Sequence, residues 1–85
     1  MKIEVFYSNG VNGFKKFNNK KKAFDFFNEK ANSKDTRFVS MYNASSGFHS
    51  TTQIDRVIAF FGEGSYLDNV SKRDSNLASK KITIK

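Results

Sequence analysis

This chain has to build its core from side-chain packing alone. None of its 85 residues is a cysteine and only one is a histidine, so neither a disulfide nor a thiolate zinc site can support a fold of this size. Ten Phe and three Tyr supply apolar material instead. Each buried ring removes roughly 150–250 Å² from water, so a few well-placed rings can hold a small core. The others are candidates for a contact surface.

The length and the distribution of apolar residues set the broad class. We expect one domain over residues 1–85. The longest apolar run, from Val57 to Phe61, is far shorter than the roughly 20 residues of a membrane span. Glu4 and the polar turn Ser8-Asn9-Gly10 interrupt the apolar region that a signal peptide would need. These features predict a soluble cytoplasmic protein that makes no membrane contact.

The first 17 residues predict a β-hairpin. Ile3, Val5 and Tyr7 alternate with polar residues and with Phe6 over residues 2–8, which is the period of a strand. Asn9-Gly10 favours a two-residue turn, which would place Val5 opposite Phe14 and Glu4 opposite Lys15. The rival turn, Asn12-Gly13, pairs fewer residues sensibly. We therefore predict strands over residues 2–8 and 11–17.

A helix is predicted directly after the hairpin. Asn18-Asn19 offers an N-cap, and residues 20–31 carry an apolar stripe at helical spacing. The stripe consists of Ala23, Phe24, Phe27 and Ala31. The run Asn32-Ser33-Lys34-Asp35 ends the helix.

The second half of the chain predicts further strands. We expect a strand over 36–43, a hairpin loop over 44–47, a return strand over 48–54, a short helix around 66–70 and a lysine-bearing edge strand over 80–85. Residues 56–61 fit either a helix that ends at Gly62 or a buried strand. Their shortness and β-branched residues favour the strand.

Together these elements predict an α+β domain. Its order is β-β-α-β-β-(β), with a small antiparallel sheet and one main helix packed on one face.

The residues that could carry catalysis form no convincing site. His49 lies near Ser50, Thr51 and Asp55, but no nucleophile elbow surrounds these positions. Asp25 and Glu29 share a helix face with lysines, which predicts a solvated surface. Gly10-Val11-Asn12-Gly13 lacks the ending of a phosphate loop. We therefore expect no enzyme activity, no metal and no cofactor.

The strongest signal is basic charge at the two ends of a chain whose net charge is +7. Five lysines fall within eight residues around the predicted helix start: Lys15, Lys16, Lys20, Lys21 and Lys22. Lysines in a first helical turn oppose the macrodipole, whereas exposed N–H groups beside them suit an anion. A possible second patch comprises Arg73, Lys80 and Lys81. The alternative is a face that is merely solvated.

Surplus aromatic residues suggest a contact surface. Under the predicted register, rings gather on the sheet face away from Val5 and Val39: Phe6, Phe17, Phe38, Tyr42 and Phe48. Exposed rings among lysines are typical of single-stranded nucleic-acid platforms and equally of protein interfaces, including homodimers. The remaining alternative is a second core layer beneath the C-terminal segment.

These observations favour a small, non-enzymatic, basic binding module that contacts nucleic acid or an acidic or nucleic-acid-associated protein through its lysine cluster. The alternative function rests on the size and composition of the chain. In these two properties the chain resembles small accessory proteins of phages and mobile elements. That resemblance implies an inhibitor or adaptor that binds a host defence or transcription enzyme directly.

Overall fold

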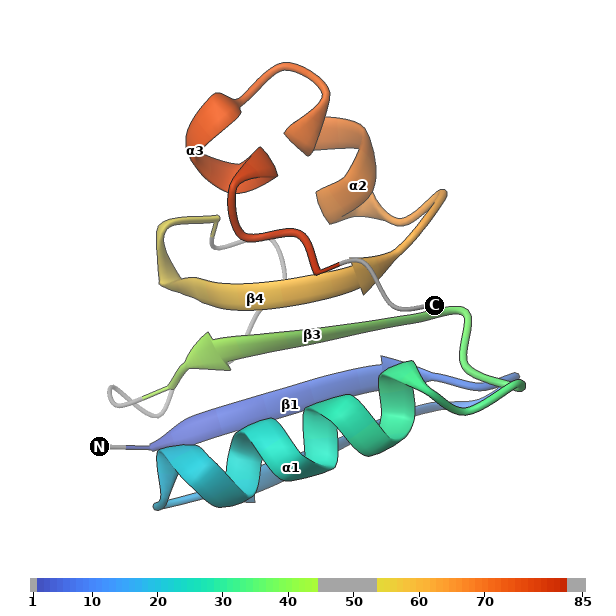
Figure 1. The fold of residues 1–85 in the computed structure, drawn as a ribbon, viewed down its shortest axis with the longest axis vertical. Helices are drawn as coiled ribbons and strands as arrows, with labels where there is room; N and C mark the ends of the chain where they lie inside the picture. Colours follow the sequence, from blue (N-terminus) through green and yellow to red (C-terminus); the bar gives the residue numbers. More distant parts are fainter. Residues whose placement is uncertain (1, 45–53, 83–85) are drawn as a thin grey trace.

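The computed structural model describes residues 2–44 and 54–82 of the chain. Four strands form one antiparallel sheet: β1 (Ile3–Ser8), β2 (Asn12–Phe17), β3 (Phe38–Asn43) and β4 (Val57–Gly62). Their order across the sheet is β2-β1-β3-β4, and helix α1 (Lys20–Ala31) covers one face (Figure 1). The predicted α+β class, with one main helix on an antiparallel sheet, is confirmed.

The hairpin forms where it was predicted, but its register is shifted by one residue. Ser8 pairs with Asn12, which leaves a three-residue loop around Gly10, and Val5 pairs with Lys15 instead of Phe14. A shift of one residue exchanges the two faces of a strand. Phe17 and Lys15 therefore lie on the α1 side, whereas Phe14 and Lys16 lie on the opposite side, which corrects the predicted arrangement.

Glycines at two positions are compatible with the longer loop. Gly10 has a φ of 99°, a left-handed conformation that a three-residue hairpin loop requires at one position. Gly13 pairs with Tyr7, and a Cβ on Gly13 would lie only 2.7 Å from the Tyr7 ring. The observed register lets the Tyr7 ring lie over Gly13 and packs the partly buried Phe17 against the α1 core.

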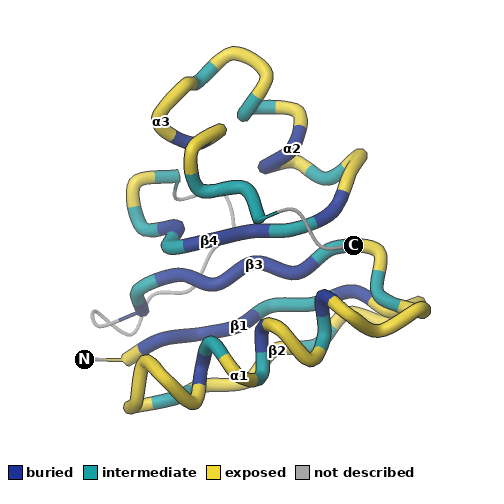
Figure 2. The backbone as a smooth tube through the Cα atoms, in the orientation of Figure 1, coloured by how far each residue is buried: buried dark blue, intermediate teal, exposed yellow. Residues whose placement is uncertain are grey.

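Helix α1 packs through the predicted stripe. Ala23, Phe27 and Ala31 are buried, and Phe24 packs partly buried at the margin of the same cluster. On the sheet, this core consists of Ile3, Val5, Val39, Met41 and Ala59. Figure 2 shows burial concentrated along β1, β3 and β4, whereas the edge strand β2 is mostly exposed.

Residues 57–62 form strand β4, which confirms the strand interpretation of this apolar run. Ala59 belongs to the core beneath α1, whereas Val57 and Phe60 belong to a second buried cluster. A strand buried on both faces needs apolar residues at consecutive positions, so its pattern resembles that of a short buried helix. A 3₁₀ turn, η1 (Ile54–Arg56), leads into it.

The second cluster is completed by two short helices beyond β4 (Figure 1). Helix α2 (Tyr66–Ser71) occurs as predicted and contributes Leu67, whereas α3 (Ser75–Ala78) was not anticipated and contributes Leu77. The predicted edge strand over 80–85 is, in its described part, a parallel bridge. Phe60 N–H donates to Lys80 O, and Ile82 N–H donates to Phe60 O.

Some predictions fall on residues 45–53 or 83–85, which lie outside the described part of the chain. They concern most of the loop over 44–47, the return strand over 48–54 (apart from Ile54), Phe48, His49 and the end of the edge strand.

The α1 core provides the first test. Replacing Phe27, which is fully buried, with Ala should lower the free energy of unfolding by roughly 3–5 kcal/mol, as for other buried Phe residues. Phe24→Ala should cost clearly less, because Phe24 is only half-buried. A denaturant melt measures both, and a loss below about 1 kcal/mol for Phe27→Ala would contradict the observed packing.

Candidate functional site

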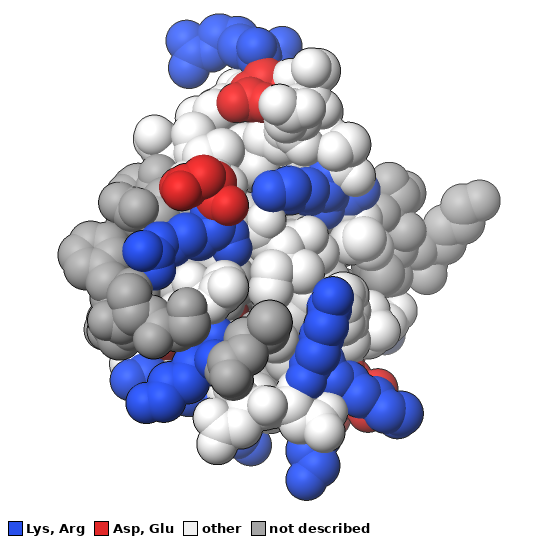
Figure 3. Space-filling model, turned by 90° about the vertical axis from the view of Figure 1, so that its left-hand side faces the viewer, with Lys and Arg blue, Asp and Glu red and all other residues white. Residues whose placement is uncertain are grey.

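The basic cluster lies where β2 runs into α1. The Asn19 side chain caps the helix by accepting a hydrogen bond from the Lys22 backbone N–H at 3.1 Å. The first turn contains no acidic residue, and Lys20, Lys21 and Lys22 are all exposed. Figure 3 shows the end of the molecule where α1 begins, with Lys and Arg side chains gathered over its lower part. All three lysines of the first turn are therefore accessible to solvent.

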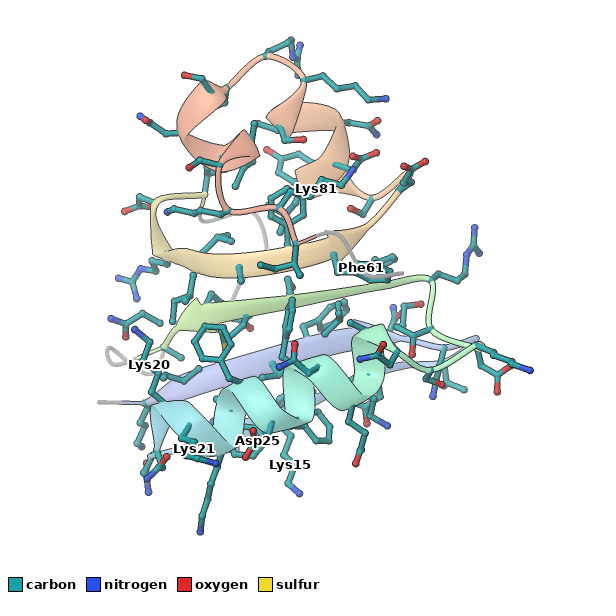
Figure 4. The ribbon with its side chains drawn as sticks, viewed as in Figure 1. Lys15, Lys20, Lys21, Asp25, Phe61 and Lys81 are labelled. Carbon is teal, nitrogen blue, oxygen red and sulfur yellow. The ribbon has the colours of Figure 1, made fainter. Side chains whose placement is uncertain are left out.

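The helix lysines make only weak contacts. Lys21 Nζ lies 3.3 Å from Asp25 Oδ2, with both side chains largely exposed, and such surface pairs contribute at most about 1 kcal/mol. Lys20 Nζ lies 6.0 Å from the centre of the Phe24 ring. Figure 4 shows Lys15 and Lys21 on the lower side of α1, with Lys20 above them at the helix start. Their charges point into solvent in different directions.

Lys15 and Lys16 lie on opposite faces of the sheet because side chains alternate along a strand, and the observed register decides which of them faces α1. Lys15 lies on the α1 side, where its Nζ is 5.6 Å from the Phe17 ring centre and 5.4 Å from that of Phe26. Lys30 contacts the same Phe26 ring at 5.2 Å. Cation–π contacts of this kind stabilise a protein by roughly 0.5–1 kcal/mol at exposed sites. Lys16 faces the other side, so the five lysines surround the β2–α1 junction instead of forming a flat patch.

The second predicted patch lies at the other end of the molecule, near α2 and α3 (Figure 4). Lys81 Nζ is 2.6 Å from Asp68 Oδ1, and the Asp68 side chain is nearly buried. Asp68 Oδ2 also accepts a hydrogen bond from Gly64 N–H at 2.9 Å. Lys81 therefore links the C-terminal segment to α2, whereas Arg73 is exposed and Lys80 is half-buried.

The hydrogen bond from Lys81, and then that from the Gly64 backbone, hold the pKa of Asp68 below its usual value. A lowered carboxyl pKa stabilises the fold above the pKa of the unfolded chain, and this stabilisation is lost as the pH falls through the folded-state pKa.

The predicted aromatic surface is divided among different environments. Phe6 and Phe38 stack with ring centres 6.0 Å apart and remain half-buried on the face opposite α1. Phe17 instead contacts Phe26 on the α1 side, and Tyr42 is buried. The second core layer that was considered as an alternative exists at the β4 end, where it buries Phe60.

Tyr42 is buried beside a carboxylate. Its hydroxyl donates to Glu4 Oε1 at 3.0 Å, in an interior position for both residues. In the observed register Glu4 pairs with Lys16, so the predicted Glu4–Lys15 pair is wrong. Burial, and then the hydrogen bond to Glu4, raise the pKa of the Tyr42 phenol.

Sequence reasoning did not find the groove beside Phe6 and Phe38. Its other side chains include Ser40, Phe60, Tyr66 and Leu67. The sequence did place Phe6 and Phe38 on a common face, but the position of α2 beside that face required the structure.

The described residues contain no group of three His, Cys, Asp or Glu side chains arranged to hold a metal ion. Within the same residues, no helix is both long and apolar enough to cross a membrane. The chain matches no protein-family model, no curated protein and no solved structure.

The Tyr42–Glu4 contact predicts a response to alkali. Because its pKa is raised, neutral Tyr42 stabilises the fold fully below the unfolded-state value of about 10, and this stabilisation declines as the pH rises further. Unfolding free energies measured across this range should fall more steeply for the wild type than for Tyr42→Phe. Equal slopes would show that the phenol does not titrate with unfolding.

The Lys81–Asp68 contact predicts that Lys81 is structural. Lys81→Ala should destabilise the fold by roughly 1–3 kcal/mol at pH 7, because it leaves a nearly buried carboxylate without its charged donor. The difference from the wild type should shrink in acid, below about pH 4, as Asp68 becomes protonated. Arg73→Ala is the control, and it should change the stability by less than about 0.5 kcal/mol.

Proposed function

We propose that this chain is a non-catalytic cytoplasmic module that binds nucleic acid, alone or in a nucleoprotein, through the lysines at the β2–α1 junction. The observation that carries the proposal is the exposed first turn of α1. It presents three lysines, no acidic residue and a helix N-terminus on one end of the molecule.

Phosphate groups suit this arrangement for two reasons. Backbone N–H groups at a helix N-terminus and nearby ammonium groups both favour an anion. Lysines that make only weak contacts within the fold keep most of their charge available, and releasing counterions from a polyanion then drives association. Such contacts position a nucleic acid without recognising its sequence.

A second candidate function is supported by the open edge of the sheet. The carbonyl oxygen of Lys2 points toward β3, where it accepts a hydrogen bond from Ala44 N–H. Backbone groups point alternately to the two sides of a strand, so this direction fixes the direction of the groups in the paired strand. On β2, the backbone groups of Asn12 and Lys16 therefore point away from β1. Phe14 and Val11 are 51% and 75% exposed nearby. An edge of this kind can add a strand from a protein partner, as an inhibitor or adaptor would, or from a second copy of the chain.

The basic junction can be tested by reversing two charges. Lys20→Glu/Lys21→Glu should leave the fold intact, because both side chains are exposed, and should weaken binding to duplex DNA. Losing two phosphate contacts should lower the slope of log affinity against log salt by about 2, at roughly 0.9 per contact. Titrations at several salt concentrations measure this slope.

The matched control is Lys34→Glu/Lys72→Glu, which changes the net charge equally at exposed positions away from the junction. It should alter the slope much less. If the wild type bound no nucleic acid at low salt, the proposal would be wrong. Capture of a protein partner from nuclease-treated lysate would then favour the second candidate.

A further inference from the structure

A small groove lies on the face of the sheet opposite α1. Its volume is about 190 Å³, and its lining includes Phe6, Phe38, Ser40, Phe60, Tyr66 and Leu67. Phe60 and Leu67 are buried, whereas Tyr66 is 51% exposed. Apart from the serine and tyrosine hydroxyls, these side chains are apolar.

Ser40 gives the groove a polar group. Ser40 pairs with Phe6 on one side and with Phe60 on the other, so its side chain lies in a row between two rings. The residue is only 3% exposed, and its Oγ has no hydrogen-bond partner in the part of the chain that the structure describes. Leaving a buried hydroxyl unpaired costs free energy, and a ligand with a polar edge would remove that cost.

The size and the rings of the groove restrict the ligand. A cavity of about 150 Å³ accepts one benzene ring, so this groove has room for a single six-membered ring with small substituents. Phe6 and Phe38 present stacked rings at an interplanar angle of 22°. A flat ring that can stack on an aromatic side chain and also hydrogen-bond to a hydroxyl matches these features.

We propose that the groove binds one pyrimidine base of a single-stranded nucleic acid. The base stacks on the aromatic side chains, with Tyr66 covering it, and its polar edge bonds to the Ser40 hydroxyl, which can donate and accept. The inference rests on the nucleic-acid function proposed above, and it extends that function from phosphate contacts to the recognition of unpaired bases.

The position of the groove relative to the basic junction favours a nucleic acid over a protein side chain. Ser40, Phe6 and Phe14 form one row across β3, β1 and β2 on the same face. Strand spacing makes this row about 10 Å long, and it ends at β2, where Lys16 lies on the same face. A strand whose base enters the groove can therefore place its phosphates beside a lysine of the basic cluster.

Two substitutions test the groove without disturbing the lysines. Binding of a short labelled oligothymidylate is compared with binding of an abasic strand of equal length and charge, at fixed low salt. Ser40→Ala should weaken binding to the oligothymidylate roughly two- to tenfold, as expected for one hydrogen bond. Tyr66→Ala should weaken it roughly fivefold or more through lost stacking.

Neither variant should change binding to the abasic strand or the salt dependence. Thermal melts should show both variants folded, since the Ser40 hydroxyl bonds to nothing in the described fold. Val11→Ala, which removes another exposed apolar side chain far along the sequence from Ser40 and Tyr66, should bind both strands as the wild type does.

The proposal would be overturned if the wild type bound both strands equally, or if the two groove variants kept wild-type affinity for oligothymidylate. If duplex binding still depended on Lys20 and Lys21, the proposed phosphate-binding function would be retained. The occupant of the groove would then be an aromatic side chain of a protein partner. Absence of all polyanion binding at low salt would instead overturn both proposals.

Discussion

Phe27 is fully buried among the side chains that α1 and the sheet direct at one another, and the basic end of the molecule depends on that contact. A 12-residue helix is only marginally stable alone in water. Three lysines in its first turn each oppose the macrodipole by about 0.3–1 kcal/mol. Truncating a buried Phe such as Phe27 to Ala costs roughly 3–5 kcal/mol, so the packing of α1 outweighs the unfavourable charge and holds the lysines in place.

The hairpin shows how one turn distributes functional groups between two faces. The alternation of apolar residues correctly predicted both strands, but Asn9-Gly10 is compatible with either a two-residue or a three-residue loop. The observed register lets the Tyr7 ring lie over Gly13 within the hairpin, and it places Phe17 and Lys15 against Phe26 of α1. The contacts with α1 cannot be read from the hairpin sequence, and the one-residue difference moved Phe17 off the proposed aromatic surface.

Other elements could be predicted from the sequence where local patterns stabilise them, but not where contacts with distant residues do. Helix α1 and its N-cap were predictable because the stripe and the Asn19 cap are local patterns. Helix α3 was not, since four residues are too few to show a period, and Leu77 is buried in a cluster with Val57, Phe60 and Leu67 from β4 and α2. Glu4 was expected opposite Lys15, and its burial beside Tyr42 required knowledge of which strand pairs with β1.

The lysines show why composition alone cannot locate a binding site. The sequence does not distinguish Lys81 from Lys20, because both belong to basic stretches. Lys81 faces a nearly buried carboxylate at 2.6 Å, so its charge is balanced within the fold and moving it would leave Asp68 buried without its partner. Lys20 lies at an exposed helix start that contains no acid. The charge of Lys20 therefore remains available to an external anion, whereas the charge of Lys81 does not. The polyanion contact proposed above is therefore assigned to the end of the molecule where β2 meets α1.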